Sequence, residues 1–158
     1  MIKLIYSVFV GVLLALFVGL GIATFYAQPS SPKWPTDLNY IKDTLTDDQR
    51  QIEKIYNEQQ ADWENKMKPY NRNVSLITLA AAIILVALSI FLTEHKYNFF
   101  ADGTMFGGVF TLFYSLGRGF ASQDSKYSFL LVTAGLVVVF VLGYKRFHPL
   151  ETNSMKKK

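Results

Sequence analysis

Four long apolar stretches separated by polar segments constrain the fold of this chain more than any other feature. They cover about residues 4–27, 74–93, 99–121 and 127–144 of the 158-residue sequence. A helix needs roughly 20 apolar residues to cross the hydrocarbon core of a bilayer. The pattern therefore predicts an all-α membrane protein, in which a single domain contains four transmembrane helices.

The first stretch begins like a signal peptide, with Lys3 ahead of an apolar run. The apolar region of a cleavable signal is about 7–15 residues long, and this run is much longer. A cleavage point after Ala27 would also place Phe25 where a small residue is required. We expect the first stretch to be a retained anchor helix.

Small residues recur at every fourth position in the first and third stretches. Residues four apart lie on one face of a helix, and such rows let two membrane helices approach closely. Small residues are also common in membrane helices generally, but two rows favour a contact between these helices, which run in the same direction. Because the rows drift around the axis, either row can also meet two neighbours. The rows include Gly11, Ala15, Gly19 and Ala23 in the first stretch, and Gly103, Gly107, Thr111, Ser115 and Gly119 in the third.

The segment of residues 28–73 is polar and opens with three prolines that cannot continue a helix. Thr46 and Gln49 have the spacing of a capping box, in which the two residues satisfy each other's helix-start amides. A thin apolar stripe then predicts an amphipathic helix over about residues 46–68, outside the membrane. Pro69 is expected to end or kink this helix before the second span.

Both tryptophans, Trp34 and Trp63, lie in this polar segment, as does Tyr56 on the apolar stripe. Aromatic residues of this kind are enriched at membrane interfaces. Three interpretations remain open for the amphipathic helix. It lies on the membrane surface, docks on the ends of the transmembrane helices, or binds a partner protein.

Arg118 and Tyr114 form the candidate polar site of the third stretch. A charge costs about 2.5–3.5 kcal/mol at the bilayer centre on insertion scales, so it is usually retained for a reason. Tyr114 lies one turn before Arg118 on the same helix face. Arg118 is also close to the helix end, where its side chain can reach the headgroups. A structural pair or headgroup contact is favoured, and an ion- or substrate-binding role is the alternative.

Asp102 is the third candidate, near the start of the same stretch. Sixteen residues at 1.5 Å per residue place it about 24 Å from Arg118, so the two do not pair within one helix. We expect Asp102 to interact with the positive helix start or with Lys96.

The sequence offers little for catalysis or cofactors. There is no cysteine, the two histidines lie outside the apolar stretches, and no cluster has metal-ligand spacing. The net charge is +4, and much of the excess lies near the C-terminus, at Lys145, Arg146 and residues 156–158. A basic tail beside a membrane helix predicts contact with anionic lipid headgroups rather than nucleic acid.

Four spans place both termini on one side of the membrane. The density of Lys and Arg in the short segments favours the cytoplasm for that side, which predicts a multi-pass cell-membrane protein. The sequence favours a non-enzymatic accessory or self-assembling structural subunit, either a homo-oligomer or a partner of other membrane subunits. The main alternative is a small oligomeric channel or transporter in which Arg118 and Tyr114 line an anion path. A membrane enzyme is the third class.

Overall fold

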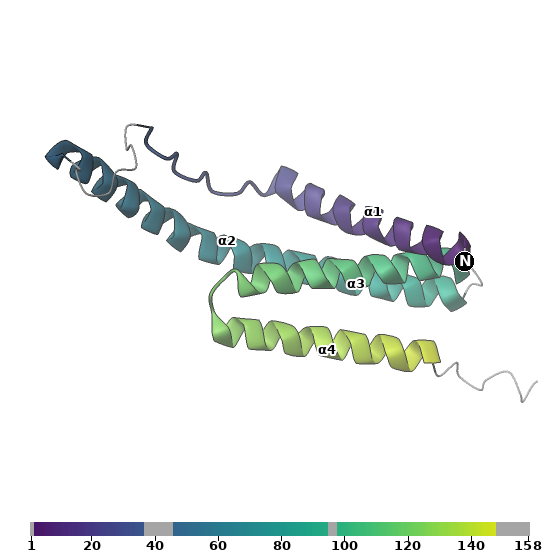
Figure 1. Ribbon diagram of the computed structural model, residues 1–158. Helices are drawn as coiled ribbons and strands as arrows, with labels where there is room; N and C mark the ends of the chain where they lie inside the picture. The colour runs from purple at the N-terminus through teal and green to yellow at the C-terminus, as the bar shows by residue number, and fades with distance from the viewer. Residues whose placement is uncertain (1, 37–45, 95–97, 148–158) are drawn as a thin grey trace, which may run out of the picture.

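The described part of the chain forms four helices and no strand. The computed structural model describes residues 2–36, 46–94 and 98–147, and it confirms the predicted all-helical class. The helices are α1 (Ile2–Phe25), α2 (Asp47–Glu94), α3 (Asn98–Phe120) and α4 (Ser125–Phe147). Figure 1 shows α3 running antiparallel beside the second half of α2 and parallel to α1.

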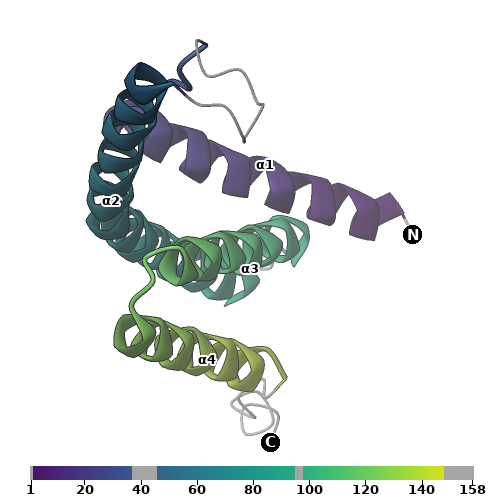
Figure 2. The ribbon, with the colours of Figure 1, turned by 60° about the vertical axis from the view of Figure 1, so that its left-hand side comes forward.

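The arrangement is a row of helices and not a closed four-helix bundle. The α2–α3 pair lies in the middle, with α1 on one side and α4 on the other (Figures 1 and 2). Within the described residues, α1 and α4 do not contact each other. Helices α2 and α3 each contact all three of the other helices.

Helix α2 does not end at Pro69, which was one of the two outcomes expected there. It is one continuous helix of 48 residues, and Pro69 lies inside it. The predicted helix over 46–68 and the predicted second span over 74–93 are thus two halves of one element. Proline removes its own amide donor, and its ring crowds the carbonyl of the preceding turn. The residues directly after it, Tyr70 and Asn71, are buried against the rest of the protein. This packing outweighs the local preference for a break.

The start of α2 shows one of the two hydrogen bonds of the predicted capping box. The amide of Thr46 donates to Oε1 of Gln49 at 3.0 Å, and the amide of Arg50 donates to the Thr46 carbonyl at 3.0 Å. Asp47 and Asp48 lie in the first turn, where negative charge is favourable. From this start α2 extends about 72 Å at 1.5 Å per residue, so its first half projects beyond the other helices.

Three helices are long and apolar enough to cross a membrane. They are Ile2–Phe25, the segment Asp47–Thr93 that contains the second half of α2, and Ser125–Lys145. Helix α3 is not one of these three, although its bounds nearly match the predicted third span of residues 99–121. Two charged residues and many small residues lower its hydropathy.

The pattern of burial is the reverse of that in a water-soluble bundle. Large apolar side chains point outward, for example Phe17 at 75% exposure and Phe129 at 72%. The interior contains small polar residues beside a similar number of apolar ones, such as Val74 and Leu131. These buried polar residues are Ser7, Asn71, Ser75, Thr78, Ser89, Thr111, Ser115 and Ser122.

Candidate functional site

Arg118 lies in the last turn of α3 and is the centre of a polar cluster. Its Nε donates a hydrogen bond to the Tyr114 hydroxyl at 3.1 Å, across one helical turn. Its Nη1 donates to Oδ1 of Asn71 in α2 at 3.0 Å. We call Arg118, Tyr114, Asn71 and Tyr70 the Arg118 cluster. The Arg118 guanidinium therefore bridges α3 and α2.

Aromatic rings complete the surroundings of this guanidinium. The Arg118 Cζ atom lies 5.8 Å from the centre of the Tyr70 ring and 5.5 Å from that of the Tyr114 ring. A cation this close to an aromatic face is attracted by the negative centre of the ring. Within the described residues, no carboxylate forms an ion pair with Arg118. The positive charge is balanced here by an amide oxygen, a hydroxyl and two rings.

Asn71 is the cluster residue that sequence reasoning missed. Only 5% of it is exposed, and its Nδ2 donates to the carbonyl of Ala121 at 3.1 Å, which satisfies the end of α3. By sequence, Asn71 belongs to the polar segment of residues 28–73, outside the apolar stretches. The signal that identifies it is helical periodicity, since Asn71, Ser75 and Thr78 continue one buried face of α2.

A second group of hydrogen bonds joins α2 to α4 one turn further along. The hydroxyls of Ser75 and Tyr127 are hydrogen-bonded to each other, and the Tyr127 hydroxyl also lies 3.1 Å from the Arg72 carbonyl. The hydroxyl of Ser115 in α3 donates to the Ser75 carbonyl at 2.7 Å. Three helices are thus tied together around Ser75.

The end of α1 is attached to the same region through Tyr26. The Tyr26 and Tyr70 rings are stacked, with centroids 5.2 Å apart and planes inclined by 2°. The Tyr70 hydroxyl donates to the Tyr26 carbonyl at 3.2 Å, and Nδ2 of Asn73 donates to the Tyr26 hydroxyl at 3.0 Å. Tyr70 therefore contacts both the guanidinium and the end of α1.

The aromatic residues predicted to be interfacial contact the linker after α1 and the first half of α2. Nε1 of Trp63 donates to the Pro29 carbonyl at 3.0 Å. The Trp34 and Tyr56 rings meet edge to face, with centroids 4.8 Å apart. The amphipathic stripe of α2 thus contacts a segment of the same chain, which none of the three open interpretations had considered.

The small-residue row of α1 contacts α3 over its first half. A Cβ atom added at Gly11 would lie 2.5 Å from Cβ of Phe106 and 2.9 Å from the Gly107 amide nitrogen, so the two backbones are in close contact there. Ala15 is half-buried. Beyond it, Gly19 has no described atom within 4 Å of such a Cβ position, and Ala23 is exposed.

The row of α3 is shared among three neighbours. Gly103 and Gly107 face Val10 and Leu14 of α1, whereas Ser115 bonds to α2 and Gly119 faces Leu131 of α4. Thr111 is buried, and its hydroxyl has no hydrogen-bond partner among the described residues. This division follows from the drift of a four-residue row around the helix axis.

The remaining candidates lie away from the Arg118 cluster. Asp102 is half-buried near the start of α3, at the opposite end from Arg118. Its suggested partner Lys96 lies outside the described residues. In the predicted basic tail, Lys145 is exposed at the end of α4, and the Arg146 side chain and residues 156–158 lie outside the described part.

The chemistry of the Arg118 cluster is that of a tether between helices. Arginine, asparagine and tyrosine donate and accept hydrogen bonds here. The bond between Arg118 and Tyr114 lies within α3, whereas the two bonds of Asn71 join α2 to the end of α3. In the described part of the chain, no group of three or more His, Asp or Glu residues has the geometry of a metal site. His95 and His148 lie outside that part. No protein-family model matches the chain, and no curated protein or solved structure is significantly similar to it.

Proposed function

We propose that this protein is an integral membrane protein, with all four helices crossing the bilayer, that serves as a non-enzymatic structural or accessory subunit of a membrane complex. The reversed burial pattern is the observation that carries this proposal. Large apolar side chains cover the outside of α1 and α4, while serines and threonines pack inside. Lipid is the environment in which such an exterior is stable, and small residues are the typical interior of membrane helix contacts.

The position of α3 supports a fourth crossing despite its lower hydropathy. It is flanked by α1, α2 and α4, so its small and polar residues face protein more than lipid. In this proposal the first half of α2 extends from the membrane on the extracytoplasmic side, with the linker after α1 packed along it. Both termini are then cytoplasmic, as the distribution of basic residues favours.

The unoccupied half of the α1 row supports a role in assembly. Gly19 continues the row that packs against α3, yet no described atom lies near its Cβ position. A helix from a second copy or from another subunit fits this row by the same close packing. We expect the protein to form a homo-oligomer or a complex with other membrane proteins through this face.

The contacts of Arg118 favour a structural role over the alternative of an anion path. Two of its nitrogens already donate to Asn71 and Tyr114, and an arginine that conducts ions needs donors directed to open space. Arg118→Gln separates the two functions. We expect this variant to weaken the fold and assembly without changing anion flux in liposomes, and a selective loss of flux would support the path.

Native mass spectrometry of the protein extracted in mild detergent tests the assembly. We expect a complex of fixed composition, either several copies of this chain or this chain with other polypeptides. Gly19→Leu is expected to reduce the complex, whereas Gly21→Leu, on another face with equally open space, leaves it intact. A wild-type protein that is monomeric throughout contradicts the proposal.

A further inference from the structure

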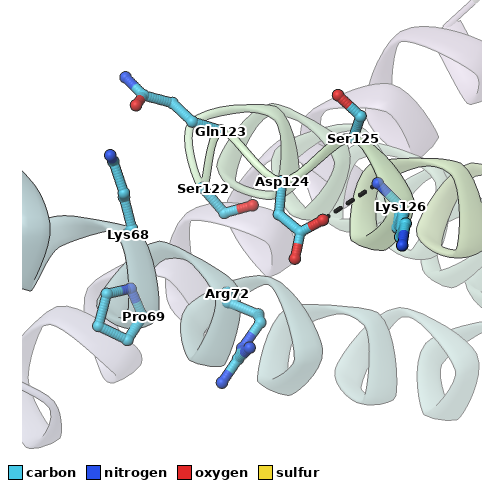
Figure 3. A pocket seen from close by; sticks show the side chains of 8 residues that line it. All are labelled: Lys68, Pro69, Arg72, Ser122, Gln123, Asp124, Ser125 and Lys126. Carbon is cyan, nitrogen blue, oxygen red and sulfur yellow. Dashed lines mark hydrogen bonds between the residues drawn. The ribbon is translucent and has the colours of Figure 1, made fainter.

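A basic pocket lies where α2 passes the loop between α3 and α4. Lys68, Pro69 and Arg72 of α2 line it together with residues 122–126. Figure 3 shows Lys68 extending along the side of the loop, with the Arg72 side chain directed away from the loop. The pocket is open to the surroundings and encloses about 450 Å³, a volume within the usual range for small-ligand sites. Three of its lining residues are cations, Lys68, Arg72 and Lys126, and one, Asp124, is a carboxylate.

The Asp124 carboxylate in this pocket already accepts hydrogen bonds from backbone amides. Oδ1 of Asp124 accepts hydrogen bonds from the amides of Lys126 at 3.0 Å and Tyr127 at 3.1 Å. It thus caps the start of α4. The preceding residue, Gln123, has a φ of 58° in the turn that follows α3. Among the described residues, none of the three cations forms an ion pair. The lining therefore keeps a formal excess of two positive charges, three cations against one carboxylate.

We propose that this pocket binds a phosphate group, supplied either by an anionic phospholipid headgroup or by a free phosphate. An arginine guanidinium offers paired donors that match phosphate oxygens, and lysines add mobile charges beside it. The Ser125 hydroxyl also lines the pocket as a neutral donor. Because the start of α4 is capped by Asp124, recognition comes from the side-chain cations and not from the helix end.

The lipid source of this phosphate rests on the proposed membrane function, and the site suits it. The pocket lies at the end of α3 and the start of α4, where the apolar parts of both helices stop. In a bilayer this level is the headgroup region. It is also at the opposite end of α4 from the basic tail, so it is a different contact from the one that the tail predicts.

Lipid retention in nanodiscs tests the headgroup source. The discs contain phosphatidylcholine with a minor fraction of phosphatidic acid, and the lipid released with the protein is identified by native mass spectrometry. We expect wild-type protein to retain phosphatidic acid preferentially. The triple variant Lys68→Gln, Arg72→Gln and Lys126→Gln should retain about a hundredfold less, since each cation near a membrane surface contributes about fivefold.

A second triple variant controls for overall charge. Arg50→Gln, Lys54→Gln and Lys66→Gln remove the same number of cations from exposed positions on the projecting half of α2. We expect this variant to retain phosphatidic acid like the wild type. Equal losses in both triple variants would overturn the pocket and leave only a general charge effect. Circular dichroism confirms folding, and if the pocket triple variant loses helicity, each single substitution should still lower retention about fivefold.

Calorimetric titration with inorganic phosphate in lipid-free neutral detergent tests the free-anion source. Binding that depends on the three cations supports the pocket and assigns a free phosphate as a ligand. Selective lipid retention without phosphate binding supports the pocket and assigns the headgroup. If neither measurement depends on Lys68, Arg72 and Lys126, the proposal is wrong. The titration needs neither a bilayer nor an oligomer, so its outcome is independent of the proposed assembly.

Discussion

The two ends of the α2–α3 pair hold their neighbouring helices in different ways. At the end where α1 and α3 begin, Gly11 and Gly107 let two backbones meet with almost no side chain between them. At the other end, hydrogen bonds from Asn71, Arg118 and Tyr127 tie α2 to α3 and α4. The first contact requires positions without a side chain, and the second requires particular hydrogen-bond donors and acceptors.

This difference separates two kinds of sensitivity to mutation. A close-packed crossing is damaged by any added volume, whatever its polarity. A buried polar network is damaged when one hydrogen-bonding partner is removed, because the group left behind stays buried without a hydrogen bond. Substitutions at the two ends should therefore follow opposite rules.

The largest effect is expected from Gly11→Leu. Its Cβ would lie 2.5 Å from Cβ of Phe106, so α1 must move away from α3, at a cost of about 3 kcal/mol. Spin labels at Leu4→Cys and Phe100→Cys measure the separation by pulsed electron resonance, since the chain has no native cysteine. Both positions are exposed.

The matched control for the crossing is Gly21→Leu, which enters open space. It should leave the distance between the two labels unchanged. An unchanged distance in Gly11→Leu as well would show that the close contact of α1 with α3 does not hold the helices together.

A smaller effect, about 2 kcal/mol, is expected from Asn71→Ala. The change leaves the Ala121 carbonyl and one nitrogen of Arg118 without partners. The free energy of unfolding in detergent, followed by circular dichroism, measures it. Asn73→Ala is the control, because Asn73 is exposed and should cost much less.

A double-mutant cycle sharpens this prediction. If Asn71 and Arg118 act as a pair, the combined loss in Asn71→Ala with Arg118→Gln is smaller than the sum of the single losses. Strictly additive losses would contradict a direct contribution of their hydrogen bond.

The smallest effect, about 1 kcal/mol, is expected from Tyr127→Phe. The ring stays, and only the hydroxyl that joins Ser75 and the Arg72 carbonyl is removed. The same unfolding measurement applies. Tyr56→Phe serves as its control, since that ring packs on Trp34 and no described hydrogen bond involves its hydroxyl. Equal stability of Tyr127→Phe and wild type would show that this hydroxyl does not stabilise the polar end.

The sequence predicted the glycine crossing better than the polar network. A row of small residues is periodic, so Gly11, Gly103 and Gly107 were recognised as packing positions from spacing alone. The bond between Arg118 and Tyr114 also follows from a four-residue spacing. The partners Asn71 and Tyr127 lie 47 and 52 positions from the residues they bond, Arg118 and Ser75, and no local pattern connects them.

Helix α2 also shows a difference between what a local sequence rule predicts and what packing against distant helices decides. The local rule for proline predicts a break at Pro69, and the cap at Thr46 and Gln49 correctly marked the start of the helix. The helix does not end at Pro69, although the lost amide and the ring both favour an end or a kink there. The burial of Tyr70 and Asn71 just beyond it depends on helices that are distant in the sequence.

By itself, the sequence determined the all-helical class, the apolar stretches and the approximate helix ends other than those expected around Pro69, because these depend on composition and on periodicity along one chain. Only the tertiary structure decided that α1 and α4 lie on opposite sides of the α2–α3 pair and that α2 continues through Pro69. It also brought Lys68 and Arg72 to Lys126 around one pocket. The physical reason is that side-chain contacts between helices depend on their relative rotation and register, and these are settled by packing against neighbours rather than by any single helix.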